Sequence, residues 1–274
     1  MPEKLRICSF ETRRAADMRS LIERHGGAAT VVPSVREIPL EENPAVFDFA
    51  EQLLAGQIDL VIFMTGVGTR FLFEVVETRF PRERFLAALQ RCQVVVRGPK
   101  PTTFLREWQV RIDHRAQEPN TWRELLEVVD SEAPVAGRTV AIQEYGEPNE
   151  EFYQELQRRG ARILPVPVYR WALPEDSSPL RQALESTIAG EFDVLLFTSA
   201  IQFKNVLQVA GSANRGVEWI AAANRCVVAS IGPTASETLN SAGLRVDIEA
   251  SPPKMGQLVQ AVFRDAPQIL MTKI

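Results

Sequence analysis

The chain has 274 residues, of which 45% are hydrophobic and 24% charged, and its formal net charge is −4. The ordinary apolar content and the nearly balanced charge exclude a disordered protein. Apolar runs such as residues 61–64 have the length of a strand and fall far short of the roughly 20 residues that a membrane-spanning helix needs. The length predicts two α/β domains or one large one.

Cysteine and histidine are too few for several common chemistries. The three cysteines form no CxxC pair, which indicates neither a disulfide framework nor a zinc site. The two histidines, His25 and His114, stand alone, so a metal centre or a Ser-His-Asp triad has little support. The mild acidity argues against broad nucleic-acid binding, whereas a small anionic ligand fits if basic groups cluster locally.

The first half of the chain alternates between strand and helix patterns. Its first residues run directly into a strand, with no apolar segment of a signal peptide, so we expect a cytosolic protein. An amphipathic helix follows and ends at Gly26, a glycine suited to the left-handed end of a helix. The later predicted elements are a second strand before Val32-Pro33, a long helix, an apolar strand at 60–64, one helix, and a strand opening at Cys92.

The second half repeats this order. Residues 193–200 resemble residues 59–66, and Cys226 and Gly232-Pro233 each lie 134 positions after Cys92 and Gly98-Pro99. Near the first strand the offset is 133. Uniformly apolar strands that alternate with helices indicate parallel sheets covered on both faces, with the strand-opening cysteines buried. We therefore predict an internal duplication that forms two flavodoxin-like α/β domains.

Four segments follow the apolar strands and could bind a ligand. They are residues 65–68, 98–100, 199–202 and 232–234. Their small residues allow close approach, and their hydroxyls and amides can hold carboxylates. The alternative for each Gly-Pro is ordinary turn chemistry. Residues 66–68 form only an incomplete dinucleotide fingerprint, and the chain contains no P-loop motif.

Several polar side chains permit two interpretations. Tyr169 is either a packing residue between domains or a proton donor. Arg13 and Arg14 at a helix start are either a solvated pair or part of an anion site. Lys100 and Lys204 either lie on the surface or reach a ligand.

Taken together, the ordered motifs resemble the uroporphyrinogen-III synthase family, in particular the bacterial branch with Thr-Gly-Val-Gly in the first of these four segments. The resemblance runs from about residue 5 to about residue 265. The segments that carry it are Thr12-Arg13 with Ala15-Ala16, and residues 65–68, 143–148, 166–171, 197–200, 231–234 and 242–244.

The resemblance implies two α/β domains joined by two antiparallel connecting strands, with an active-site cleft between them. One domain would comprise residues 1–36 with 172–274, and the other residues 37–171. The repeat itself favours a cut in the loop 131–137, so the two interpretations differ. We follow the family, because residues 36–39 and 170–174 then form the crossing strands.

The implied reaction converts hydroxymethylbilane, a linear tetrapyrrole rich in carboxylates, to uroporphyrinogen III with inversion of ring D. It requires no metal and no cofactor. The resemblance further implies a monomer without nucleic-acid or membrane partners, and a transient contact with the preceding pathway enzyme. Tyr169 matches the family's tyrosine near the departing hydroxyl. The expected substrate-binding residues are Arg13, Thr65, Gly66, Gly68, Gly98, Lys100, Tyr145, Gly146, Ser199, Ala200, Gly232 and Thr234.

Two positions depart from the family pattern. Ala235 and Pro101 stand where the family often carries threonine, so backbone amides carry more of the expected binding than side chains do. A two-lobed binding or sensor protein for an anionic ligand is the alternative function, because the fold alone does not distinguish it from an enzyme. A nucleotide-binding α/β enzyme is disfavoured by the incomplete glycine motif.

Overall fold

A computed structural model describes residues 4–40 and 42–273. The first three residues, on which the expectation about a signal peptide partly rests, lie outside the described part. The chain divides into two units. Unit 1 comprises Met1–Arg36 and Ala172–Ile274, and unit 2 comprises Glu37–Trp171.

Unit 1 contains a five-stranded parallel sheet in the order β12-β11-β10-β1-β2. Read from β2, this is the 2-1-3-4-5 order of flavodoxin-like folds. Its strands are β1 (Arg6–Ser9), β2 (Ala28–Val31), β10 (Val194–Phe197), β11 (Val227–Ser230) and β12 (Ile248–Glu249). Its helices are α1 (Ala15–Arg24), α8 (Ser178–Ile188), α9 (Ala200–Ser212), α10 (Gly216–Ala223), α11 (Pro233–Ser241) and α12 (Met255–Thr272).

Unit 2 contains the equivalent sheet in the order β6-β5-β4-β7-β8, which is again parallel throughout. Its strands are β4 (Leu60–Phe63), β5 (Gln93–Val96), β6 (His114–Arg115), β7 (Thr139–Gln143) and β8 (Arg162–Val166). Its helices are α2 (Pro44–Leu54), α3 (Gly66–Glu77), α4 (Arg82–Leu89), α5 (Pro99–Glu107), α6 (Trp122–Ser131) and α7 (Glu150–Arg158). The predicted pair of parallel α/β sheets is confirmed.

The duplicated halves exchange strands. At the repeat offset, β4, β5 and β6 correspond to β10, β11 and β12, while β1 and β2 correspond to β7 and β8. Each sheet therefore takes two strands from one half of the sequence and three from the other. As a result, the repeat boundary at residues 131–137 lies inside unit 2 rather than between the units.

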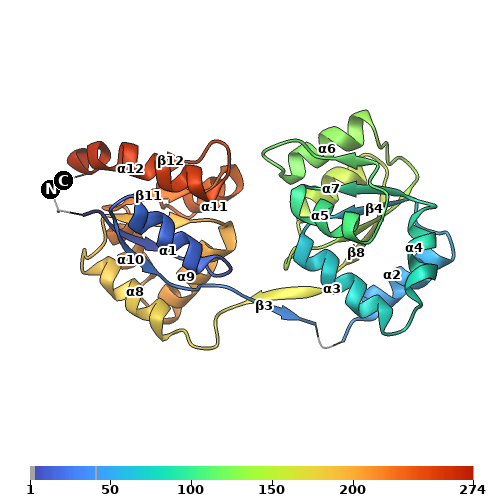
Figure 1. Ribbon diagram of the computed structural model, residues 1–274, viewed down its shortest axis with the longest axis horizontal. Helices are drawn as coiled ribbons and strands as arrows, with labels where there is room; N and C mark the ends of the chain where they lie inside the picture. Colours follow the sequence, from blue (N-terminus) through green and yellow to red (C-terminus); the bar gives the residue numbers. More distant parts are fainter. Residues whose placement is uncertain (1–3, 41, 274) are drawn as a thin grey trace. The chain divides into compact units, whose positions relative to one another are not determined.

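A third, two-stranded antiparallel sheet pairs β3 (Arg36–Pro39) with β9 (Tyr169–Ala172). The chain passes from unit 1 to unit 2 after Arg36 and returns after Trp171, so both passages lie within this pair (Figure 1). The predicted antiparallel connecting strands are thus confirmed. In the described part of the chain, no helix is both long and apolar enough to cross a membrane.

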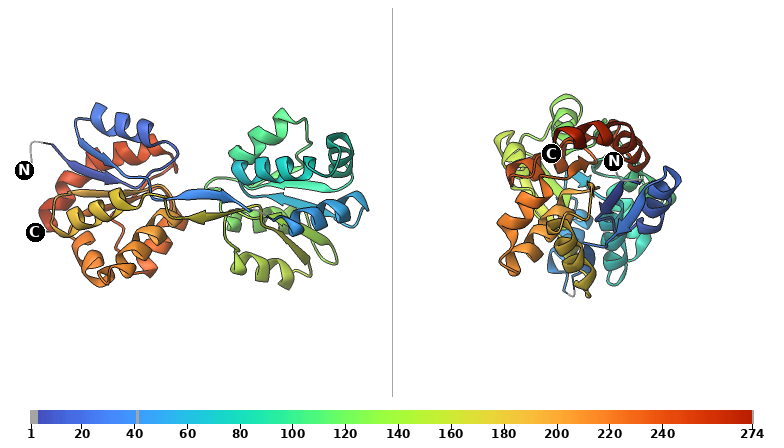
Figure 2. Two further views of the ribbon diagram at one scale, coloured as in Figure 1. Left: turned by 90° about the horizontal axis from the view of Figure 1, so that it is seen from below. Right: turned by 90° about the vertical axis from the view of Figure 1, so that its left-hand side faces the viewer.

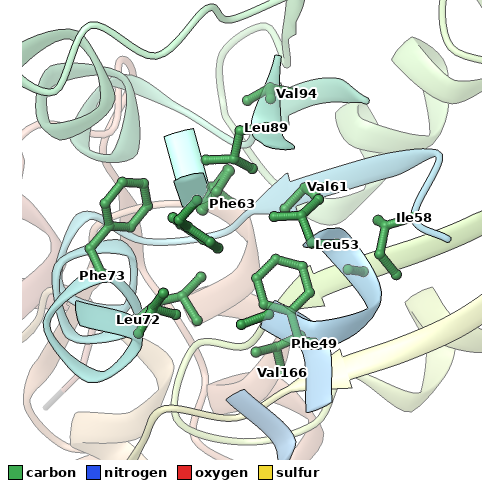
Figure 3. Close-up of a cluster of buried hydrophobic side chains, with 14 of the residues drawn as sticks. Phe49, Leu53, Ile58, Val61, Phe63, Leu72, Phe73, Leu89, Val94 and Val166 are labelled. Carbon is green, nitrogen blue, oxygen red and sulfur yellow. The ribbon is translucent and has the colours of Figure 1, made fainter. Parts of the chain in front are cut away.

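Helices cover both faces of each sheet (Figure 2), because alternate strand residues bury apolar side chains on opposite faces. In unit 1, α1 and α12 cover one face and α8 to α11 the other. In unit 2, α6 and α7 cover one face and α2 to α5 the other. Figure 3 shows the core between the unit 2 sheet and helices α2 to α5, in which Phe49, Leu72 and Phe73 pack with the strand residues Val61 and Phe63.

Two local predictions differ from the structure. We expected one helix between the apolar strand and the cysteine strand, whereas α3 and α4 both lie there, separated at Pro81, which caps α4. Residues 66–68, expected as a loop, form the first turn of α3, because the Thr65 side chain accepts a hydrogen bond from the Gly68 N–H and so begins the helix. Gly26 takes a left-handed conformation (φ 90°) after α1, as predicted.

Cys92 and Cys226 are buried at the starts of equivalent strands, as predicted, and Cys8 is buried in β1. Burial raises the pKa of Cys92 and of Cys226 to about 11 and raises the pKa of Cys8 further. Since the thiolate is the reactive form, we expect no thiol of the native protein to react with a disulfide reagent at about pH 8. The chain unfolded in guanidinium chloride should release chromophore from all three thiols. Rapid labelling of the native protein would contradict the buried placement.

Candidate functional site

Each sheet has one switch point, a place where the connections that follow two neighbouring strands run toward opposite edges of the sheet. It lies between β1 and β10 in unit 1 and between β7 and β4 in unit 2. Ligands of open parallel sheets bind beyond the carboxyl ends of the strands at such a point. In each unit, we call the residues that directly follow the strands the carboxyl edge.

Gln143 closes the switch point of unit 2. Its buried side chain lies at the end of β7, and its Oε1 accepts hydrogen bonds from the N–H groups of Met64 (3.2 Å) and Thr65 (3.1 Å). Thr65 Oγ1 in turn accepts from the Gly68 N–H at 3.0 Å. These bonds satisfy amides that a strand end and a helix N-terminus leave open. The Gly68 amide, predicted to bind substrate, is thus paired within the protein.

Tyr169 lies beside this capped helix start. Its side chain on β9 is buried, and its Oη is 3.4 Å from Thr65 Oγ1. The ring packs against Phe71 of α3, with a centroid separation of 6.0 Å. The structure therefore brings Tyr169, the predicted proton donor, and Thr65, a predicted substrate-binding residue, together at the carboxyl edge of unit 2. Two hydroxyls that adjoin can each donate or accept a proton.

An aromatic group extends the edge from Tyr169. Trp171, two residues along β9, lies 6.5 Å from Tyr169 and 5.7 Å from Tyr145 between ring centroids. Gly146 follows Tyr145 with φ 88°, and a Cβ there would lie 2.6 Å from Trp171 Cδ2, so only glycine fits. Burial raises the pKa of Tyr145, with Arg97 acting in the opposite direction. Tyr145 is therefore a neutral donor at physiological pH.

The neighbouring helix starts of unit 2 pack closely. Gly98 caps α5, and Pro99 begins it, because proline needs no N–H partner in the first turn of a helix. A Cβ on Gly66 would lie 2.9 Å from the Lys100 backbone oxygen, so the absence of a side chain lets α3 and α5 approach. Lys100 itself is exposed. Gly66 therefore serves the packing of this edge as well as any access to its amides.

The carboxyl edge of unit 1 holds the other predicted residues. Glu11, buried after β1, accepts from the Arg14 N–H at 3.0 Å and from the Thr198 hydroxyl, so its carboxylate already occupies the start of α1. Ser199 caps α9 without a side-chain capping bond, which leaves its hydroxyl outside the helix. The remaining residues are Arg13, which is exposed before α1, Ala200 at the start of α9, Gly232, which caps α11, and Thr234, which is exposed in its first turn.

A shallow pocket of about 540 Å³ adjoins the unit 2 edge. Tyr169 lines it, as do Glu144, Glu147, Glu150 and Arg170. Burial raises the pKa of Glu144, whose Oε1 accepts a hydrogen bond from the hydroxyl of Tyr153 at 2.5 Å. Glu147 and Glu150 outnumber Arg170, the arginine of this lining, so the charge of the pocket disfavours an anion. Anionic groups of a ligand would therefore be favoured at the edge itself rather than here.

Sequence reasoning missed one charged residue of the unit 2 edge, Arg97. It follows β5 directly, and its guanidinium carbon lies 5.2 Å from the ring centroid of Tyr145. The repeat carried a signal for it, because the equivalent residue 134 positions later is Ile231. A cation in place of an aliphatic residue, next to a predicted binding loop, marks a difference between the halves that packing does not require.

The chemistry of the edges is that of hydrogen-bond donors. In residues 4–40 and 42–273, no group of three histidine, cysteine or acidic side chains could hold a metal ion. What the edges offer is tyrosine, threonine and serine hydroxyls, helix N-termini and a guanidinium. Such groups bind carboxylates and can supply a proton.

The fold and the two edges define a duplicated α/β protein with flavodoxin-like sheets. Residues 16–260 match the family model described as uroporphyrinogen-III synthase HemD. The chain belongs to this family.

Similar proteins include two relatives and one solved structure. A putative uroporphyrinogen-III synthase of Methanothermobacter thermautotrophicus is 28% identical over 232 residues, which cover 84% of this chain and 87% of the relative. An uncharacterized protein of Bacillus subtilis is 26% identical over 260 residues, which cover 93% of each chain. The crystal structure of a mutant uroporphyrinogen III synthase from Thermus thermophilus shares the fold, with a TM-score of 0.72, 23% identity, and coverage of 97% of this chain and 99% of that one.

Proposed function

We propose that this protein is a uroporphyrinogen-III synthase, which converts hydroxymethylbilane to uroporphyrinogen III with inversion of ring D. The observation that carries the proposal is the pair of adjoining hydroxyls, Tyr169 and Thr65, at the switch point of unit 2 in a chain of this family. A substrate with many carboxylates and one leaving hydroxyl needs anion-binding donors and a proton source. The described edges offer both.

The proposed reaction begins when the terminal hydroxyl leaves as water. The C–O bond breaks, and the Tyr169 hydroxyl supplies the proton that the departing oxygen takes up. The electron pair of the pyrrole nitrogen stabilises the remaining carbon as an azafulvene cation. The substituted carbon of ring D then attacks this carbon and forms a spiro intermediate. The bond from that ring D carbon to the methylene bridge of ring C breaks, the methylene bonds to the free α carbon of ring D, and the proton lost from that carbon returns to the Tyr169 oxygen. The net change is the loss of one water molecule.

The larger task of the protein is to position its substrate. Without restraint the linear tetrapyrrole closes to the other isomer, so the edges must hold ring D with its substituted carbon toward the cation. In unit 2 the proposed contacts come from Thr65, Gly66, Gly98, Lys100 and Tyr145 with Gly146. In unit 1 they come from Arg13, Ser199, Ala200, Gly232 and Thr234. The cofactor independence, the monomeric state, the contact with the preceding enzyme and the location in the cytosol stay predictions.

An isomer assay tests the reaction. The protein is incubated with hydroxymethylbilane generated by its synthase, the product is oxidised, and the uroporphyrin isomers are separated by chromatography. We expect isomer III with the protein and isomer I in a control without it. Only isomer I in both samples would overturn the proposal. Saturable binding of hydroxymethylbilane without isomer III would indicate the two-lobed binding protein instead.

A further inference from the structure

Arg97 occupies an unusual place on the carboxyl edge of unit 2. Its backbone N–H continues the sheet by donating to Phe63 O at 3.0 Å, and its side chain is half-buried. The guanidinium lies against the ring of Tyr145. Arg97 thus directs a positive charge into the same group of residues that holds Tyr145 and Tyr169.

The charge of Arg97 has no carboxylate partner in the described part of the chain. Burial lowers the pKa of its guanidinium, and the groups that oppose this effect are the hydroxyls of Tyr145 and Tyr169. By contrast, the half-buried Arg159 pairs with Asp130 at 2.6 Å and with Glu155 at 2.8 Å. A desolvated cation without a counter-ion destabilises the folded protein.

The fold itself does not require this cation. In unit 1 the equivalent residue, Ile231, makes the same backbone bond, in which its N–H donates to Phe197 O at 2.9 Å. An aliphatic side chain therefore suffices at this point of the same architecture. The contact with the Tyr145 ring offsets part of the desolvation cost of Arg97, but no carboxylate of the described residues neutralises its charge, so an anionic ligand is the partner that this position favours.

We propose that Arg97 binds a carboxylate of the substrate, while Tyr145 and Trp171 pack beside the pyrrole ring that bears it. This inference rests on the proposed function. A guanidinium presents two parallel N–H donors to a carboxylate, and the enclosed position strengthens such a bond. The aromatic rings of Tyr145 and Trp171, 5.7 Å apart between centroids and inclined at 54°, provide apolar faces against which a pyrrole can pack. Arg97 is therefore a substrate-positioning residue of unit 2.

The test is direct binding of uroporphyrin III, a stable octacarboxylate, measured by quenching of tryptophan fluorescence. Arg97→Met keeps the length of the side chain and removes its charge, and we expect an affinity about 10- to 100-fold weaker. The affinity of Arg97→Lys should lie between those of the wild type and Arg97→Met, because an ammonium group binds a carboxylate as a point charge. The matched control is Arg84→Met, which removes an exposed arginine from α4 and should leave the affinity unchanged.

Thermal unfolding separates a binding role from a structural one. Removing an unpaired, desolvated charge should leave the melting temperature of Arg97→Met unchanged or raise it. An affinity of Arg97→Met within about twofold of the wild type would overturn the inference. The inference would also be wrong if Arg97→Met lowered both the melting temperature and the affinity and if Arg97→Lys restored both.

The outcome is distinguishable from that of the proposed function. If the wild type forms isomer III and Arg97→Met keeps its affinity and its KM, the reaction stands and the role of Arg97 fails. If the wild type forms only isomer I but binds uroporphyrin III in an Arg97-dependent manner, the carboxylate site stands and the reaction fails. In an active protein, we expect Arg97→Met to raise KM for hydroxymethylbilane more than it lowers kcat.

Discussion

Alanine at position 68 is expected to lower the free energy of unfolding by about 2–4 kcal/mol. A Cβ on Gly68 would overlap the carboxamide of Gln143 and lie 2.6 Å from its Cδ. Gln143 is fully buried and holds the N–H groups of Met64 and Thr65, so its displacement leaves two amides unsatisfied. Urea unfolding followed by circular dichroism measures the change. We expect activity in the isomer assay to fall as well, because Thr65 belongs to the same arrangement.

A glycine in the equivalent helix of unit 1 provides the matched control. Gly211 lies in α9, and a Cβ there would meet nothing within 4 Å. Because alanine favours a helix over glycine, Gly211→Ala should stabilise the protein by about 0.5–1 kcal/mol. Stabilisation of both variants would show that Gln143 does not occupy the space beside Gly68.

The repeat supports the role of Gln143 as the acceptor for the N–H group of Met64. In each unit a glutamine side chain accepts from the equivalent backbone N–H, but the two glutamines stand at different positions of the repeat. The unit 1 residue equivalent to Gly68 is Gln202, whose Oε1 accepts from the Thr198 N–H at 2.8 Å. Thr198 is the equivalent of Met64. At the first-strand offset, Phe10 takes the place of Gln143. In unit 1, therefore, a glutamine on the helix (Gln202) occurs with an apolar residue after the strand (Phe10). In unit 2, a glycine on the helix (Gly68) occurs with a glutamine at the end of the strand (Gln143).

Replacing Tyr169 by phenylalanine is expected to lower kcat for uroporphyrinogen III formation by about 100-fold or more. The substitution removes the hydroxyl 3.4 Å from Thr65 Oγ1 and leaves the buried ring against Phe71. If Tyr169 protonates the departing hydroxyl, the loss lies mainly in kcat, because binding of the carboxylates does not depend on that group. Initial rates of isomer III formation at several substrate concentrations measure it.

Two variants separate proton donation from general loss of a hydroxyl. Tyr153→Phe removes another buried tyrosine hydroxyl of unit 2, the donor to Glu144, and should lower stability while kcat stays near that of the wild type. Thr65→Val removes the helix cap and the neighbour of Tyr169, at a cost of about 1 kcal/mol of stability. A kcat for Tyr169→Phe equal to that of the wild type would leave Tyr169 as a packing residue only.

The local pattern predicted much of the edge. Gly98-Pro99 and Gly232-Pro233 do begin helices, and the apolar strands are buried on both faces, because these features depend on neighbouring residues and on periodicity. The bonds of Gln143 to Met64 and Thr65 link residues almost 80 positions apart, so no local pattern contained them. Arg97 escaped notice for a related reason, since its lack of a counter-ion is a property of the folded surroundings.

The sequence by itself determined that the protein is a duplicated α/β chain with parallel sheets and small residues after its strands. The constant offset of 134 residues is visible without a structure, as is the apolar character of strands such as residues 60–63 and 194–197. Only the tertiary structure decided which strands pair. Because the two halves carry nearly the same strand pattern, β4 is locally as well suited to lie beside β1 as beside β7. The pairing with β7, and with it the composition of unit 2 from both halves, is stabilised by contacts such as those of Gln143, which form only when β7 lies beside β4.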